Sequence, residues 1–275
     1  MKVFFLGTGA AEGVPGLFCN CAVCARARKN GGKDRRLRTG VLVDDAVRID
    51  LPPDTLAQVH AYPQLPLNDL ENLLFTHTHD DHFAVRELQY LSPNFAPCRK
   101  TPVRVWGTEY LLGRIRSTMG KFFEPAPLVL TAVEPFETYP VAHLAVTPIP
   151  SHHKDDELCL NFLLTEPATG KTLLYASDTG WYHPATWEFL AGRRLDAVVL
   201  ECGLGASDSG YEGHLSLAGC VSVKEKLVAE SGLAKDAPFF LTHISHTGLL
   251  CHDELSERAA PHGMAVAYDG LELIF

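Results

Sequence analysis

The chain has 275 residues, of which 46% are hydrophobic and 21% are charged, and its formal net charge is −9. This composition is that of an ordinary globular protein with enough apolar residues for a sizeable core. The negative charge argues against a general nucleic-acid binder, because the phosphate backbone would be repelled. No apolar run approaches the length of about 18 residues that a membrane span needs, so we expect no membrane partner.

The apolar segment near the N-terminus, Val3–Leu6, stops at Gly7. It is shorter than the apolar region of a signal peptide, about 7–15 residues, so we expect a cytoplasmic protein. Eight cysteines in a long chain of that kind are not expected to form disulfides. Five lie among apolar neighbours and are expected to be small buried side chains, namely Cys98, Cys159, Cys202, Cys220 and Cys251.

Short β-branched or aliphatic runs alternate with helical stretches along the whole chain. The apolar runs predict strands at 2–6, 40–43, 46–50, 72–76, 103–106, 143–149, 158–165, 172–177, 196–201, 238–242, 264–268 and 271–275. Helical patterns predict helices at 83–91, 108–119, 184–191, 215–230 and 252–260. Residues 120–142, rich in proline and glutamate, are expected to run over the surface. No linker or short repeat divides the chain, so we expect sheets with helices outside them in a single domain over 1–275.

The most informative segment is His77–His82, with the sequence His-Thr-His-Asp-Asp-His, directly after an apolar run. On an extended segment His77 and His79 project to the same side, because side chains alternate with period two. Two converging imidazoles suit zinc or a similar borderline ion. Asp81 and His82 follow on a turn and can face a second ion, and ions about 3.5–4 Å apart are a known device for splitting phosphate esters. A lone histidine is more often a core or surface group, but this density predicts a metal site.

Further polar groups stand where predicted strands end. They are Asp50, the adjacent pair His152 and His153, Asp178 and His243. Strand ends are a common way of placing ligands at the rim of a sheet on a rigid support. Each group alone is weak evidence, since a strand-end aspartate is more often a turn former. Together with the first motif they complete a set of ligands for two ions.

These motifs, with Gly7-Thr8-Gly9 near the N-terminus, resemble those of metallo-β-lactamase-fold hydrolases, in the family's order along almost the whole chain. The resemblance implies an α+β fold, a metallo-β-lactamase-type αββα sandwich. In such a fold two mixed β-sheets pack face to face with helices outside, and the metals lie at one edge.

The same resemblance implies a role for each polar group. One ion would be held by His77, His79 and His153, the second by Asp81, His82 and His243, and Asp178 would bridge both. His153 is preferred to His152 because its spacing from the preceding strand fits better, and the choice between them stays open. Asp50 is expected to orient a metal ligand or the nucleophilic water.

Within this superfamily the chain is similar to the cyclic phosphodiesterases of the carbon–phosphorus lyase pathway. The similarity rests on residues 7–15, the cysteine segment 19–28, and residues 133–136, 242–246 and 269–272. In that family three cysteines and the second histidine of His-Ile-Ser-His hold a structural zinc. Here this implies a zinc-binding loop over 17–30, with the ligands Cys19, Cys21, Cys24 and His246. Three thiolates and an imidazole suit a closed tetrahedral site, and the alternative is three unligated thiols.

His214 stands in Gly-His-Leu-Ser just ahead of a predicted helix. The similar phosphodiesterases have a histidine there that is proposed to protonate the leaving group, and an imidazole suits that role. The alternative is a capping or surface histidine. With this resemblance we expect His214, Asp81 and Asp50 to act in catalysis.

A basic stretch lies between residues 26 and 38. It contains Arg26, Arg28, Lys29, Lys33, Arg35, Arg36 and Arg38, with Asp34 as its one acid. We expect a solvated face, and the alternative is an edge that attracts an anionic substrate.

The sequence therefore favours a dinuclear-metal phosphodiesterase acting on a small, anionic, cyclic phosphodiester. Its cofactors would be two catalytic divalent ions, zinc or manganese with iron also suitable, and one structural zinc. One alternative is hydrolysis of a carboxylic ester, lactone or thioester by the same ions. Another is a non-catalytic pathway partner, like the pyrroloquinoline quinone biosynthesis branch of the superfamily. The sequence leaves a homodimer open.

Overall fold

The computed structural model describes residues 1–207 and 209–275, and two seven-stranded sheets form its centre. The first sheet has the order β16 (Glu272–Ile274), β1 (Lys2–Gly7), β2 (Gly40–Val43), β3 (Val47–Ile49), β4 (Asn72–Leu74), β5 (Val103–Gly107) and β6 (Leu128–Ala132). The second has the order β15 (Ala265–Val266), β14 (Phe239–Thr242), β12 (Ala197–Glu201), β10 (Lys171–Ala176), β9 (Leu160–Glu166), β8 (Leu144–Pro150) and β7 (Tyr139–Val141). A small parallel pair joins β11 (Arg194–Leu195) to β13 (Gly232–Leu233).

Apolar side chains alternate between the two faces of the strands, so each sheet packs against the other sheet on one face and against helices on the other. Leu173 and Tyr175 of β10 point into the core between the sheets, whereas Leu174 and Ala176 point to the outer helices. In the first sheet, β4 likewise turns Leu74 inward and Leu73 outward. Because every second residue faces one side, each strand can be apolar on both faces and still form two distinct cores.

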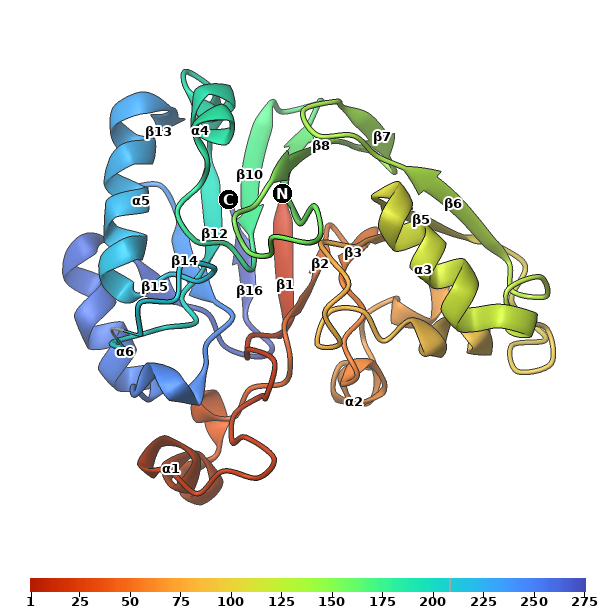
Figure 1. The fold of residues 1–275 in the computed structure, drawn as a ribbon, viewed down its shortest axis with the longest axis horizontal. Coiled ribbons are helices and arrows are strands. Elements are labelled where there is room, and N and C mark those ends of the chain that lie inside the picture. Colours follow the sequence, from red (N-terminus) through yellow and green to blue (C-terminus); the bar gives the residue numbers. More distant parts are fainter. Residues whose placement is uncertain (208) are drawn as a thin grey trace.

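The helices cover the two outer faces of this sandwich (Figure 1). The second sheet is covered by α4 (Pro184–Leu190), α5 (Leu217–Glu230) and α6 (His252–Ala259). The first sheet is covered by α3 (Glu109–Met119) and α2 (Thr55–Ala61), and α1 (Ala22–Asn30) projects below the body. The four layers confirm the expected αββα sandwich with two mixed sheets. None of the helices in the described part of the chain has the length and apolarity needed to cross a membrane.

The predicted strands begin and end within two residues of the observed ones, but residues 120–142 were wrongly expected to be a surface excursion. They contain β6 and β7, which are the edge strands of the two sheets. The prolines that hid these strands, such as Pro127 and Pro140, are tolerated because an edge strand has backbone N–H groups that no neighbour needs. The single domain expected over 1–275 stays a prediction.

The helical predictions needed two changes. The segment expected as a helix over 83–91 is a 3₁₀ helix from Val85 to Leu91, because residues 82–84 pair with Leu51 through two backbone hydrogen bonds of 2.8 Å. The helices α1 and α2 were not predicted, and both are short, at 9 and 7 residues. The periodicity signal of so short a helix is weak.

The basic stretch is not wholly a solvated face, because Arg36 is buried. Its guanidinium donates to Thr8 Oγ1 and to the carbonyl of Ala267, each at 2.7 Å, and lies 3.0 Å from His252 Nδ1. Burial, followed by the positive charge of Arg36, lowers the pKa of His252 from 6.5 to about 4. His252 is therefore neutral in the folded protein at neutral pH and accepts a hydrogen bond from Arg36.

This pairing predicts an acid-sensitive contribution to stability. The unfolded chain takes up a proton on His252 near pH 6.5, whereas the folded chain resists until about pH 4. The stabilisation is therefore complete above pH 6.5 and is lost as the pH falls through this window. Relative to His252→Asn, we expect the wild-type free energy of unfolding to drop by on the order of 2 kcal/mol between pH 7 and pH 4. Urea denaturation at both pH values measures it. Parallel pH profiles would contradict the assignment, and the exposed His262→Asn serves as the control.

Candidate metal centre

The polar groups singled out in the sequence meet at one edge of the sandwich. Strands β3 and β4 are parallel in the first sheet, and β10, β12 and β14 are parallel in the second. Asp50 follows β3, Asp178 follows β10 and His243 follows β14, so these side chains lie at the carboxyl ends of strands from both sheets. This edge is where open sheets of parallel strands usually bind ligands.

The first cluster at this edge consists of His77, His79 and His153. One ring nitrogen from each lies within 4.8 Å of the others, and His153 Nε2 lies 3.0 Å from His79 Nδ1. The three come from the segment after β4 and from the segment after β8. His152 does not join them, because its Nδ1 lies 2.9 Å from the carbonyl of Trp181 and its ring packs on His183. Of the two histidines that the sequence left open, the structure brings His153 to the cluster.

The second cluster consists of Asp81, His82, Asp178 and His243, all buried. Asp178 Oδ2 lies 2.9 Å from His82 Nε2, and its other oxygen, Oδ1, lies 3.2 Å from His243 Nε2. The same Oδ1 is 3.7 Å from His153 Nε2 in the first cluster. The carboxylate of Asp178 therefore stands between the two clusters.

The donor atoms of both clusters suit cations. Among the described residues, His77 Nε2 and His82 Nε2 are buried without a hydrogen-bond partner. Although His82 Nε2 is close to Asp178, the two groups are not aligned for a hydrogen bond. This is the arrangement expected of two metal ligands whose lone pairs point at the same third atom. Buried groups of this kind are costly unless paired or bound to a metal, so the residues present fit divalent ions.

The outward-facing nitrogens of the same rings are held by oxygen atoms. His82 Nδ1 donates to Asp50 Oδ2 at 2.7 Å, and His153 Nδ1 donates to the carbonyl of Gly213 at 2.9 Å. His77 Nδ1 lies 2.9 Å from Thr76 Oγ1, which itself donates to Asp50. Each contact leaves the lone pair of the other ring nitrogen facing the cluster, which is how metal-binding histidines are usually oriented. Asp50 thus orients His82.

Three of these strand-end residues have a left-handed backbone. The φ angles are 64° at Asp50, 51° at Asp178 and 54° at His243. Such angles are uncommon outside glycine, and they cluster at functional sites where the surroundings hold them. Here the turn lets each side chain leave its strand and point toward the shared edge.

Protonation states at the site follow from burial and charge. Burial lowers the pKa of His77 well below its ordinary value. Burial alone would raise the pKa of Asp178, but His243 and His82 bring it well below its ordinary value. His77 is thus neutral and Asp178 ionised, as metal ligands are. Burial alone would lower the pKa of His82, but the carboxylates of Asp81 and Asp178 outweigh burial and raise that pKa well above its ordinary value, so His82 would lose a proton on binding a cation.

Two buried glutamates were missed in the sequence. Glu157 accepts hydrogen bonds from the backbone N–H and the hydroxyl of Thr78, at 2.9 and 2.6 Å, and so anchors the segment between His77 and His79. Glu201, the last residue of β12, accepts from His214 Nδ1 at 2.6 Å. Glu201 ends a predicted strand just as Asp178 follows one, and that shared position was the signal that could have identified it.

His214 lies against both clusters. Its ring centroid is 4.7 Å from that of His153 and 5.3 Å from that of His243, with the latter ring stacked. Burial by itself lowers the pKa of His214, but the charge of Glu201 outweighs it and raises the pKa to about 9. The imidazole is therefore protonated at neutral pH, and bound cations nearby would bring its pKa down toward neutrality.

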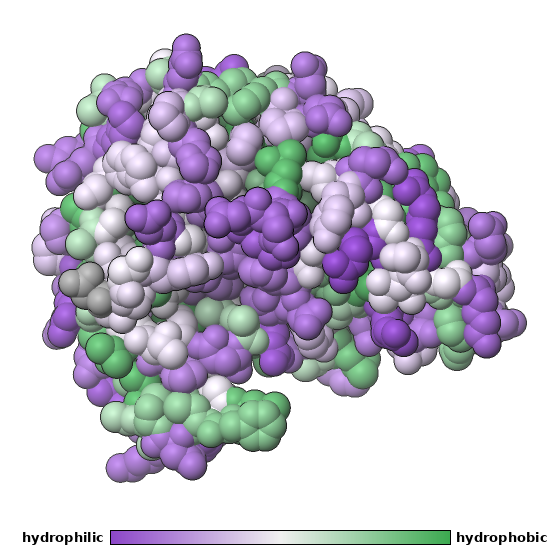
Figure 2. Space-filling model, in the orientation of Figure 1, coloured by the Kyte–Doolittle hydropathy of each residue, from purple (hydrophilic) through white to green (hydrophobic). Residues whose placement is uncertain are grey.

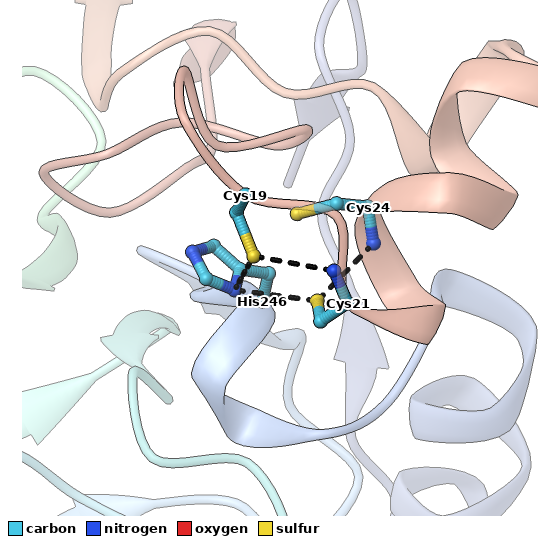
Figure 3. A group of neighbouring side chains, drawn as sticks. All are labelled: Cys19, Cys21, Cys24 and His246. Atoms are coloured by element: carbon cyan, nitrogen blue, oxygen red, sulfur yellow. Dashed lines mark hydrogen bonds between the residues drawn. The ribbon is translucent and has the colours of Figure 1, made fainter.

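A separate cluster brings together Cys19, Cys21, Cys24 and His246 (Figure 3). His246 Nδ1 lies 3.7 Å from Cys19 Sγ and 3.6 Å from Cys21 Sγ. A tetrahedral zinc with ordinary bond lengths would separate sulfur and nitrogen ligands by about 3.6 Å, so the residues present fit zinc. Backbone N–H groups of Gly16 and Cys24 donate to the sulfurs, and the Cys24 N–H is the first cause that lowers the pKa of Cys21 to about 7.

The remaining cysteines are not disulfide-bonded. Four of the five expected to be buried are buried, but Cys98 is exposed, because it lies in the irregular segment between the 3₁₀ helix and β5. Its apolar neighbours in the sequence did not reflect neighbours in space.

Replacing Cys21 with serine is expected to lower stability more than it alters chemistry. A structural zinc contributes folding free energy, and a loss of a few kcal/mol would lower Tm by roughly 5–10 °C. Elemental analysis should find about one zinc fewer per chain, while turnover changes little because the cysteines do not contact the His/Asp clusters. Cys98→Ser, at an exposed cysteine outside the cluster, is the matched control. An unchanged Tm and zinc count would show that the structural assignment is wrong.

Solved structures with this fold include one described as a new diphosphatase from the PhnP family. It is 27% identical, with a TM-score of 0.78 over 100% of this chain and 97% of that one. Zinc-bound PqqB from Methylobacterium extorquens is 22% identical, with a TM-score of 0.76 over 100% of both chains. The short form of human tRNase Z is 17% identical, with a TM-score of 0.68 over 100% of this chain and 99% of that one. At these lower identities, the last two show the fold alone.

A curated relative is the octanoyltransferase of Porphyromonas gingivalis (strain ATCC BAA-308 / W83). It is 30% identical over 287 residues, which cover 100% of this chain and 51% of the relative. The chain thus spans about half the length of that protein. The family described as the β-lactamase superfamily domain matches residues 46–244, which include most of the polar groups described above. With the sandwich, its His/Asp edge and this match together, the chain belongs to the β-lactamase superfamily and has the metallo-β-lactamase fold.

Proposed function

We propose that the protein is a dinuclear-metal phosphodiesterase that cleaves small anionic phosphodiesters. The observation that carries the proposal is the position of Asp178 between two clusters of metal-binding side chains, with the His214–Glu201 pair beside them. The 27% sequence identity of this chain to a diphosphatase of the PhnP family supports phosphorus as the reacting atom. Zinc, manganese and iron all suit such His/Asp ligands.

In this proposal each residue has one task. His77, His79 and His153 would hold one ion, Asp81, His82 and His243 the other, and Asp178 both. When bound, the ions would supply positive charge that activates water and offsets the negative charge developing on the oxygens around phosphorus.

The remaining groups prepare this arrangement or move a proton. Asp50 and Thr76 hold the rings of His82 and His77 in place. His214, kept protonated by Glu201, would deliver its Nε2 proton to the leaving oxygen. A poor alkoxide leaving group needs such a donor, which favours alkyl phosphodiesters as the class of substrate.

A second candidate is hydrolysis of a carboxylic ester, lactone or thioester at the same site. The observation that favours it is the relative named octanoyltransferase, about half of which matches this chain. The non-catalytic alternative is disfavoured, because a carrier does not need a carboxylate between two clusters or a protonated histidine beside them.

Hydrolysis of bis-p-nitrophenyl phosphate and of a p-nitrophenyl carboxylate ester separates the two enzymatic candidates. The assay uses protein stripped of metal and reloaded with zinc or manganese, so that each rate refers to a known ion. We expect a higher kcat/KM on the phosphodiester. A higher kcat/KM on the carboxylate ester, with zinc and with manganese alike, would favour the second candidate.

A further inference from the structure

A cavity of about 880 Å³ opens directly beside His214. Its walls come from residues 181–187, which include the start of α4, from the loop segments 204–207 and 209–215, and from the first turns of α5. We call it the aromatic cavity and define it by Trp181, His183, Trp187, Tyr211 and His214. A volume of this size accommodates an organic group much larger than a phosphate.

The cavity presents flat aromatic surfaces to solvent. Trp181 is 44% exposed and Tyr211 is 50% exposed, although both line a concave surface. Trp181 is held in place, because its ring packs on Trp187 at 4.9 Å and its carbonyl lies 2.9 Å from His152 Nδ1. Tyr211 packs its ring 5.4 Å from that of His214. Large aromatic groups kept in fixed positions and left uncovered favour stacking with a bound ring.

The charges and hydroxyl groups of the cavity narrow the class of ligand. Among the described residues that line it there is no lysine or arginine, Glu212 is the one carboxylate, and the positive charge of His214 is already paired with Glu201. A second phosphate is therefore disfavoured. Four serines supply hydroxyls to the lining, namely Ser207, Ser209, Ser216 and Ser222. Aromatic planes with hydroxyl groups and little charge suit an uncharged heteroaromatic ring that carries hydrogen-bonding edges.

His214 relates the cavity to the chemistry. Its ring lines the cavity on one side and stacks on His243 of the metal cluster on the other. If His214 protonates the leaving oxygen, the group attached to that oxygen extends into the cavity. We propose that the aromatic cavity binds a nucleobase-like ring on the leaving-group side of the phosphodiester. This inference rests on the phosphodiesterase function proposed above.

A matched pair of substrates tests the proposal on the metal-loaded enzyme. The pair is adenosine 2′,3′-cyclic phosphate and the 2,3-cyclic phosphate of 1-O-methylribose, which has the same reacting bonds and lacks the base. We expect a higher kcat/KM for the nucleotide. Trp181→Leu should reduce this preference by roughly 5- to 150-fold, mainly through KM, because a stacked ring is lost. Trp181→Phe should retain most of the preference, and Tyr110→Ala, at an exposed aromatic residue of α3, should leave it unchanged.

A binding measurement keeps the test independent of catalysis. Adenosine should quench the indole fluorescence of the holoenzyme saturably, ribose should not, and Trp181→Leu should weaken the quenching. If the enzyme cleaves both cyclic phosphates equally well and adenosine does not bind, the cavity proposal is overturned while the phosphodiesterase function stands. If neither is cleaved but adenosine binds through Trp181, the cavity binds the ring and the proposed reaction fails.

Discussion

Replacing Asp178 with alanine is expected to abolish turnover and to release ions from the His/Asp site, while the zinc proposed for the cysteine cluster is retained. Asp178 stands between the two clusters, with Oδ2 2.9 Å from His82 Nε2 in the second cluster and Oδ1 3.7 Å from His153 Nε2 in the first. Without its negative charge, Asp81 would be the one carboxylate left among the proposed ligands of two cations. Loss of a partner that only orients a metal ligand already costs about 10–100-fold in affinity or activity, so loss of a shared ligand should cost more than about 100-fold.

Elemental analysis together with turnover on bis-p-nitrophenyl phosphate measures this effect. Zinc at the proposed cysteine site should remain at about one per chain, because Asp178 does not belong to that cluster. Asp156→Ala is the control, since Asp156 is a mostly exposed carboxylate paired with Lys154. A variant that keeps two further ions and its wild-type rate would show that Asp178 does not join the clusters.

Replacing His214 with alanine is expected to slow cleavage of an alkyl phosphodiester or a ribose cyclic phosphate by about 10²–10⁴-fold. An alkoxide is a poor leaving group and needs a proton in the transition state, and the Glu201 carboxylate keeps that proton on His214. A p-nitrophenolate leaving group is stable without the proton, so cleavage of bis-p-nitrophenyl phosphate should suffer far less. Metal content should not change, because the role is proton donation.

Comparison of the two substrates separates this role from binding. Equal losses on both, with metals retained, would indicate that His214 only binds substrate, and no loss on either would leave it a surface residue. Glu201→Gln gives a graded comparison, because the amide still meets His214 Nδ1 but no longer favours the imidazolium. We expect a smaller version of the same substrate dependence, since the donor remains and is only less often protonated.

The strands and most helices could be predicted because their signals are local. The outward and inward faces of β10 alternate along Leu173, Leu174 and Tyr175, and this pattern is visible without any neighbour. The edge strand β6 was missed because its flanking prolines signal a loop, and only its place at the rim of the sheet makes them harmless. Short helices such as α2 were missed because two turns carry too little periodicity.

The amino-acid sequence by itself determined which side chains could bind metal. His77–His82 places several ligands within six residues, and Cys19–Cys24 does the same for the thiolates, so little long-range information was needed to suspect either site. Only the tertiary structure decided between His152 and His153, since the choice depends on His79, which lies 74 residues from His153. The tertiary structure alone showed that Glu201 pairs with His214 and that the aromatic cavity lies beside this pair. Those relations depend on which strands lie side by side and on how the chain turns after each strand at the sheet edge. The spacing of residues along the sequence determines neither.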